Sequence, residues 1–249
     1  MPGPEVIWWR RPYSLDLIWP DDDKKLLPPG HLIFGKGIFV FQISKIMKDA
    51  DFVYKGPGSL KNEGKVTWTA PSNIALVKYW GKKGLQLPAN PSLSLSLSTS
   101  ATTTELSYWP NESSDEEVSF DLFFDGSPKP SFRPKVADFF KRILPYVPFI
   151  KDYHLQIKTS NTFPHSSGIA SSASGMGALA LCVMSLEKEL SGLEDEDYFL
   201  KKASFLARLG SGSACRSIEG PVVGWGGHPE YPGSNDLYGV RFAGGIHPI

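Results

Sequence analysis

The stretch from Phe163 to Leu181 (FPHSSGIASSASGMGALAL) holds residues suited to chemistry, because a serine and glycine loop leads directly into an apolar helical pattern. A helix N-terminus leaves its first N–H groups unpaired and carries partial positive charge, so it attracts anions. Gly168 lets an anion approach the backbone, and Ser171 and Ser172 add hydroxyl donors. The pattern predicts a phosphate-binding loop that is neither a Walker A loop nor a Rossmann turn. A helix simply capped by serine is the alternative.

A second small-residue loop, SGSACRS, repeats this chemistry and adds a cation. Ser211 and Ser213 offer hydroxyl groups, and Gly212 keeps the backbone accessible. Arg216 offers a planar guanidinium fork that suits a carboxylate or a phosphate. Considered alone, Arg216 is equally compatible with a surface ion pair.

A third stretch, KYWGKK, places three lysines around two aromatic residues and a glycine. Lys78, Lys82 and Lys83 are candidate partners for phosphate, although an aromatic core with solvated lysines is the alternative. Together, the two loops and these cations suit an enzyme that handles several phosphates and a carboxylate.

Strands and helices must position these loops. Apolar residues at helical spacing predict helices over residues 135–147 and from about Ser172 to Leu190. The alternation of leucine and serine in PSLSLSLS predicts a half-buried strand whose serines form a solvated or polar face. Val66 to Thr69 suit another strand, which we expect Pro71 to break. Strands and helices mix without regular βαβ alternation, so we expect an α+β fold with a mixed sheet and helices on one face.

The composition narrows the function classes. The chain has 249 residues, of which 41% are apolar, and its 26 basic and 26 acidic residues balance. We therefore expect no nucleic-acid or membrane partner. Two isolated cysteines, Cys182 and Cys215, indicate a reducing compartment, and five scattered histidines give no zinc motif. No stretch reads as a signal peptide or a spanning helix, so we expect a cytoplasmic location.

The first 46 residues differ from the rest of the chain. They are rich in Trp and Pro and contain the charge run DDDKK. We expect residues 1–46 to be an extension outside a folded domain of residues 47–249. The alternative is an edge hairpin that uses IFVFQI as one strand.

Three motifs together resemble a known family. PHSSGIASSA matches the phosphate-loop pattern P-x-x-x-G-[LI]-x-S-S-A of the GHMP kinase superfamily. APSNIALVKYWGK, and SGSACRSIEG followed by VVGW, resemble its decarboxylase branch, the diphosphomevalonate decarboxylases. The resemblance runs from about Val66 to the C-terminus. It implies the GHMP-kinase N-terminal domain, which has a ribosomal protein S5 domain 2-like fold.

The resemblance also implies a reaction. It is the ATP-dependent decarboxylation of mevalonate 5-diphosphate to isopentenyl diphosphate, with ADP, phosphate and CO2 as the other products, in the mevalonate route to isoprenoids. ATP and Mg2+ are the cofactors that it implies, and the full-length family member is expected to be a homodimer.

By the same resemblance, Lys78 and Arg216 are catalytic residues, and Asn73 lies close to the site. Substrate binding falls on residues of two motifs: Tyr79, Trp80, Gly81, Lys82, Ser211, Gly212, Ser213, Ala214, Cys215 and Arg216. ATP binding falls on the phosphate loop: Ser166, Ser167, Gly168, Ile169, Ala170, Ser171 and Ser172. Ser172 is also the implied Mg2+ ligand.

The chain departs from the family pattern in places. Pro91 stands where many relatives carry serine. The family's general base is an Asp from a second domain, and no residue before Ile249 matches it; Asp236 lies in a turn-like segment. We therefore expect the C-terminal domain to be absent and this chain to be inactive alone. Two alternatives stay open: a GHMP small-molecule kinase acting on mevalonate or phosphomevalonate, and a non-catalytic nucleotide-binding remnant.

Overall fold

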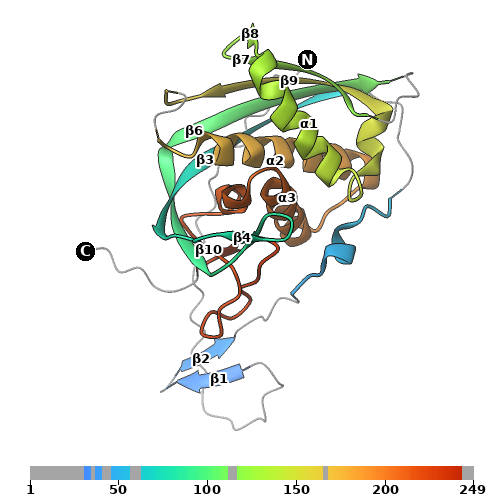
Figure 1. The fold of residues 1–249 in the computed structure, drawn as a ribbon. Helices are drawn as coiled ribbons and strands as arrows, with labels where there is room; N and C mark the ends of the chain where they lie inside the picture. Colours follow the sequence, from blue (N-terminus) through green and yellow to red (C-terminus); the bar gives the residue numbers. More distant parts are fainter. Residues whose placement is uncertain are drawn as a thin grey trace.

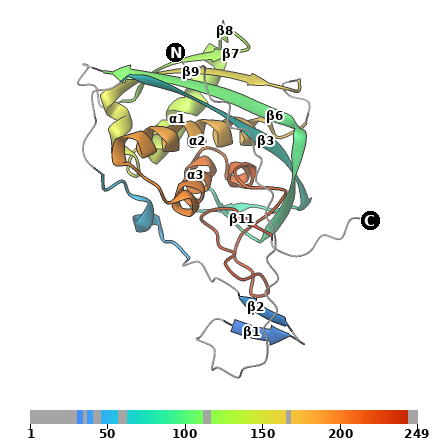
Figure 2. The same cartoon turned by 180° about the vertical axis from the view of Figure 1, so that it is seen from behind.

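The computed structural model describes residues 31–34, 37–40, 46–56, 63–111, 117–164 and 168–242, the first two ranges by backbone alone. A curved sheet wraps around two stacked helices, α2 and α3, and a third helix, α1, lies beside them (Figure 1). Seen from behind, the same helices fill the concave side of the sheet (Figure 2). The predicted α+β architecture, with helices on one face of the sheet, is confirmed.

The main sheet has seven strands in the order β11-β10-β6-β9-β7-β8, with β3 paired to β6. Their bounds are β3 Gly64–Val77, β6 Ser92–Pro110, β7 Ser119–Phe124, β8 Ser127–Pro128, β9 Tyr153–Asn161, β10 Val222–Trp225 and β11 Val240–Arg241. β7 and β9 are parallel, whereas β6 pairs antiparallel with β3, β9 and β10. The sheet is therefore mixed, as predicted.

The break predicted at Pro71 is wrong. β3 continues from Gly64 to Val77, and the pairing with β6 only shifts register between Pro71 and Ser72. β3 pairs with β6 alone, so it is an edge strand. An edge strand tolerates proline, because the missing N–H has no second neighbour to bond. The irregularity instead turns Ser72 and Asn73 into the domain, where both are buried.

The helices agree closely with the sequence pattern. Their bounds are α1 Arg133–Ile143, α2 Ser171–Ser191 and α3 Glu196–Gly210, with short 3-10 turns η1 Asp49–Phe52, η2 Pro130–Phe132, η3 Pro148–Asp152 and η4 Gly212–Ser217. The helix predicted from Ser172 to Leu190 is confirmed to within one residue at each end. α1 ends at Ile143, four residues before the end of the predicted range, and Gly192 closes α2 in the left-handed conformation at φ 68°.

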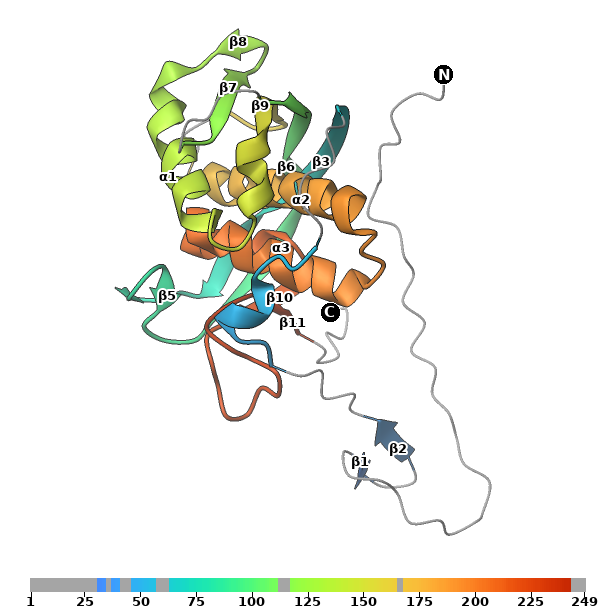
Figure 3. The same cartoon turned by 90° about the vertical axis from the view of Figure 1, so that its right-hand side faces the viewer.

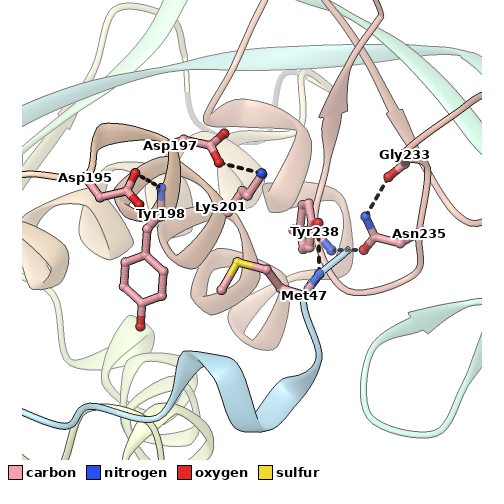
Figure 4. Close-up of polar contacts among 8 residues, drawn as sticks. All are labelled: Met47, Asp195, Asp197, Tyr198, Lys201, Gly233, Asn235 and Tyr238. Atoms are coloured by element: carbon pink, nitrogen blue, oxygen red, sulfur yellow. Dashed lines mark hydrogen bonds and ion pairs between the residues drawn. The ribbon is translucent and has the colours of Figure 1, made fainter. Parts of the chain in front are cut away.

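The segment that follows residue 46 packs into the core. Phe52 is fully buried and stacks on Phe205 of α3, with ring centroids 4.4 Å apart. The backbone N–H of Met47 donates to the Tyr238 hydroxyl at 3.4 Å, beside the Lys201–Asp197 ion pair of α3 (Figure 4). These contacts make η1 part of the folded domain.

Upstream of this segment, β1 His31–Phe34 and β2 Gly37–Val40 form an antiparallel hairpin that is a sheet of its own. It includes part of IFVFQI, but it does not extend an edge of the main sheet. Residues 1–30 lie outside the described residues, and the boundary at residue 46 stays a prediction.

Candidate functional site

Three parts of the chain meet on one side of the domain. The start of α2, the end of α3 and the hairpin of β4 Lys82–Lys83 and β5 Leu87–Pro88 lie on one side of the domain (Figure 3), and η4 follows α3 in the chain. Lys82 and Gln86 of this hairpin lie against Gly212 of η4: a Cβ built on Gly212 would be 3.4 Å from atoms of both side chains. The structure therefore brings the KYWGKK and SGSACRS motifs together.

Arg216 lies at the centre of this region and is 3% exposed. Its Nη1 donates to Ser92 Oγ at 2.7 Å, and its guanidinium carbon lies 5.6 and 5.8 Å from the ring centroids of Tyr79 and Trp225. Burial lowers the pKa of Arg216. No carboxylate of the described residues forms an ion pair with it, and its Nε has no hydrogen-bond partner. The alternative of a surface ion pair is therefore excluded.

The serines of PSLSLSLS were predicted to form a solvated or polar face, and the solvated form is wrong for Ser92 and Ser94 but not for Ser98, which is exposed. Ser92 and Ser94 are buried, at 5% and 0% exposure, whereas Leu93 and Leu95 on the other face are partly exposed. Ser92 and Ser94 are buried because this part of β6 carries them on the face that packs against η4, as the hydrogen bond from Arg216 to Ser92 shows.

Several of these buried hydroxyls have no partner. The side-chain oxygens of Ser72, Ser94 and Ser96, like Nε of Arg216, are buried and make no hydrogen bond within the described part of the chain. Leaving such a group unsatisfied costs about 1–3 kcal/mol. Buried orphan groups are rare in native proteins, and a bound ligand, ion or water is the usual explanation. Ser94 lies two residues from Ser92, the hydrogen-bond partner of Arg216, on the same face of β6, so an orphan hydroxyl and a buried cation share a region that suits an anion.

Asn73 fixes η4 to the sheet. Its amide donates to the carbonyl oxygen of Ser213 at 3.3 Å and to Ser217 Oγ at 2.8 Å. Within η4, Ala214 and Cys215 are buried, and the Cys215 thiol donates to the Gly212 carbonyl oxygen at 3.0 Å. Burial raises the pKa of this thiol to about 12, so it is not a nucleophile at neutral pH. The side chains of Ala214 and Cys215 shape the loop from inside, whereas Ser211 and Ser213 are partly exposed.

The KYWGKK motif combines exposed and anchored residues. Trp80 is 85% exposed, while its backbone N–H donates to Asn90 Oδ1 at 2.7 Å. Lys83 forms an ion pair with Asp236 at 3.1 Å. Lys78 and Lys82 are exposed, and neither has an ion-pair partner among the described residues. These two lysines, and not Lys83, are available to an anion.

The predicted phosphate loop is described only in part. Ser166 and Ser167 lie outside the described residues. Gly168 has a positive φ of 81° and open space around it, so the backbone there is approachable. Ala170, with Ile169 before it, precedes α2 and is its N-cap; its side chain makes no cap bond. The alternative of a serine-capped helix is therefore wrong, and Ser171 and Ser172 start the helix itself.

A pocket of about 130 Å3 opens beside these two serines. Phe124 of β7 and Phe132 of η2 form one wall, with ring centroids 5.4 Å apart and planes at 65°. Lys135, in the first turn of α1, completes the lining on this side. We did not anticipate this pocket from the sequence. Its residues come from separate elements and share no motif, so no local signal was present to find it.

The described residues contain neither a cluster of metal ligands nor a membrane-spanning helix. They contain no group of three or more His, Cys, Asp or Glu side chains that could hold a metal ion. None of their helices is long and apolar enough to cross a membrane.

Comparison with known proteins agrees with this geometry. The family model for the diphosphomevalonate decarboxylase-like N-terminal domain matches residues 70–235. The diphosphomevalonate decarboxylase of Eremothecium gossypii is 38% identical over 181 residues, which cover 67% of this chain and 43% of that protein. The solved mevalonate diphosphate decarboxylase from Enterococcus faecalis is similar with a TM-score of 0.56 and 32% identity, covering 72% of this chain and 51% of that chain.

A further solved structure, of MDDEF in complex with MVAPP, AMPPCP and magnesium, gives the same TM-score of 0.56 at 32% identity and covers 72% of this chain and 50% of that chain. The chain thus spans about half the length of the relatives that it matches. By its fold, by the arrangement of its motifs and by these matches, the chain belongs to the diphosphomevalonate decarboxylase-like family, through that family's N-terminal domain.

Proposed function

We propose that this chain forms the ATP- and substrate-binding half of a diphosphomevalonate decarboxylase, which converts mevalonate 5-diphosphate and ATP to isopentenyl diphosphate, ADP, phosphate and CO2. The observation that carries the proposal is the buried guanidinium of Arg216, which has no carboxylate partner and contacts Ser92 on the face of β6 that also carries the orphan hydroxyl of Ser94. A buried cation without a carboxylate partner is costly unless an anion meets it. The substrate has two such anions, its carboxylate and its diphosphate.

The groups around Arg216 divide naturally between these anions. In our proposal, the guanidinium fork binds the carboxylate or an adjacent phosphate oxygen, because its geometry suits either. Lys78 and Lys82, which are exposed and unpaired, meet the charge of the diphosphate. Ser211, Ser213 and the accessible backbone at Gly212 add donors. The exposed Trp80 ring and Tyr79 flank the substrate and limit its contact with water.

The pocket beside α2 suits part of a nucleotide. Its volume of about 130 Å3 is below the roughly 300–1,000 Å3 of sites that enclose a whole ligand, so it fits a planar base. The Phe124 and Phe132 rings favour stacking with a base. The phosphates would then lie at the start of α2, where N–H groups and the hydroxyls of Ser171 and Ser172 are suited to bind them. Magnesium fits there with Ser172 and phosphate oxygens as ligands, since magnesium usually keeps substrate phosphates and water.

The proposed reaction depends more on positioning the two substrates than on reactive side chains. The terminal phosphoryl group of ATP moves to the tertiary hydroxyl of mevalonate 5-diphosphate. The resulting phosphate ester is a better leaving group than hydroxide. The bond to the carboxylate then breaks, its electron pair forms the new double bond, and phosphate and CO2 leave. We assign the proton acceptor to no described residue, because the Asp236 carboxylate is engaged by Lys83 and by the Gly227 N–H.

A ligand series separates this proposal from a small-molecule kinase. Calorimetric titration should show that the chain binds mevalonate 5-diphosphate more tightly than the monophosphate, and the monophosphate more tightly than mevalonate. The reverse order would favour a kinase of a less phosphorylated substrate and would contradict the proposal. The expectations of a cytoplasmic location, which comes from the sequence, and of a homodimer, which comes from the family resemblance, belong to the same proposal.

A further inference from the structure

Lys135 lines the pocket from the first turn of α1, on the same rim as Ser171 and Ser172. Its ammonium group has no hydrogen bond and no ion pair among the described residues. It is thus a cation in a pocket whose other lining residues are uncharged. Neither the sequence motifs nor the family resemblance had singled out this residue.

The surroundings of Lys135 are electrostatically unfavourable for its charge. Partial burial lowers its pKa, and the positive charge of Lys82 lowers it further. Lys82 comes from β4, on the substrate side of the region, whereas Lys135 comes from α1, on the pocket side. Two ammonium groups from distant parts of the sequence, neither with an ion-pair partner among the described residues, therefore lie close enough to repel each other, and a polyanion bound by both would relieve that repulsion.

Lys129, the lysine that precedes Lys135 in the sequence, packs against aromatic rings. Lys129 lies over the Phe132 and Phe124 rings, with its Nζ 5.4 and 6.0 Å from their centroids. It thus packs against the wall of the pocket. Lys135 is the lysine that lines the pocket together with Ser171 and Ser172 at the start of α2.

We infer that Lys135 binds the polyphosphate of the nucleotide and, together with Lys82, holds the negative charge that bridges the nucleotide and the second substrate. A lysine suits this role because its ammonium is a compact point charge with three donors on a flexible stem, able to follow a phosphate chain. The inference rests on the proposed function, since it takes the pocket beside α2 as the base site.

The test is a binding series on the 249-residue chain, with Mg-ATP, AMP and adenosine as probes and calorimetry as the readout. Lys135→Met should weaken Mg-ATP binding about 10- to 100-fold, as expected for losing a hydrogen bond to a charged group. AMP should lose less, and adenosine should bind as it does to the unmodified chain. Lys135→Arg should restore most of the ATP affinity. Lys141→Met, on the same helix but away from the pocket, is the matched control and should bind all three probes normally.

The outcomes separate the inference from the function on which it rests. If the unmodified chain binds ATP and adenosine but Lys135→Met binds ATP equally well, the role of Lys135 is wrong and the base pocket stands. If the variant loses ATP and adenosine to the same extent, Lys135 supports the shape of the pocket and does not contact phosphate. If the unmodified chain binds neither probe, the nucleotide site itself is wrong. Unchanged melting temperatures of the variants exclude loss of folding as the cause.

Discussion

The Nη1 atom of Arg216 donates a 2.7 Å hydrogen bond to the Oγ of Ser92, and this buried contact joins η4 to β6. Ser92 in turn donates to the carbonyl oxygen of Trp225 on β10. The guanidinium is thereby fixed in direction before any ligand binds. Its Nε and the hydroxyl of Ser94 are left without partners in the same region. Such prior positioning lowers the entropy that a ligand must lose on binding.

Ser94 should contribute to binding but not to folding. Ser94→Ala removes a buried hydroxyl that has no hydrogen bond, so the free energy of unfolding should stay constant or rise by up to about 1 kcal/mol. The affinity for mevalonate 5-diphosphate should fall about tenfold, because a donor to the anion is lost. Thermal melting and calorimetric titration measure the two effects.

Ser92→Ala is the matched control for Ser94. It removes a hydroxyl that is hydrogen-bonded on both sides, so it should lower the melting temperature. Equal destabilisation by both variants would show that the Ser94 hydroxyl is satisfied in solution and is no part of an anion site.

The buried ion pair between α2 and α3 should be costly to break but not to replace. Lys202 Nζ lies 2.6 Å from Glu187 Oε2, and both side chains are almost fully buried. Burial raises the pKa of Glu187 and lowers that of Lys202. Glu187→Gln leaves a buried charge unpaired and should lower the free energy of unfolding by about 3–5 kcal/mol.

The double variant Glu187→Leu with Lys202→Met removes both charges and should be far more stable than the single variant, because neither group then remains unpaired. Urea denaturation followed by circular dichroism compares the two. If the double variant were the less stable one, the pair would be contributing net stability and this reading of it would be wrong.

A chain that starts at Met47 should be as stable as the 249-residue chain. The contacts of η1 begin there, and the main-chain nitrogen of Met47 can still donate to Tyr238. Deletion through Phe52 should differ, because it removes a fully buried ring stacked on Phe205, and Phe52→Ala alone should cost about 3–5 kcal/mol. Differential scanning calorimetry of the 249-residue chain, the two deletions and Phe52→Ala gives the comparison. A marked loss of stability on removing residues 1–46 alone would place that segment in the fold.

Much of the fold was accessible from the sequence because its signals are local. The spacing of apolar residues fixed α2 to within one residue, and the small-residue loops indicated where the backbone is approachable. The errors came from tertiary context. Pro71 did not end its strand because β3 lies at an edge, and Ser92 and Ser94 are buried because this part of β6 packs under η4. Neither the edge position of β3 nor the packing of η4 on β6 can be predicted from the residues next to them in the sequence.

In the candidate site too, residues in local motifs were predictable and residues brought there by tertiary packing were not. Arg216, Lys78 and Lys82 stood in recognisable motifs, so their types and spacing predicted anion binding. Lys135 stood in none, because its relation to Ser171 and Ser172 exists only once α1 and α2 have packed on the sheet. Roles that depend on two helices meeting cannot be predicted from the residues of either one.

The central claim is that Arg216 is held buried and unpaired for an anion of the substrate. The most direct measurement is calorimetric titration of mevalonate 5-diphosphate into the unmodified chain and into its Arg216→Gln and Arg216→Lys variants. Removing one partner of a buried charge pair typically costs about 2–5 kcal/mol, so Gln should weaken binding roughly 30-fold or more. Lys should restore only part of it, because the fork geometry is lost. Equal affinities for all three chains, with melting temperatures unchanged, would contradict the account.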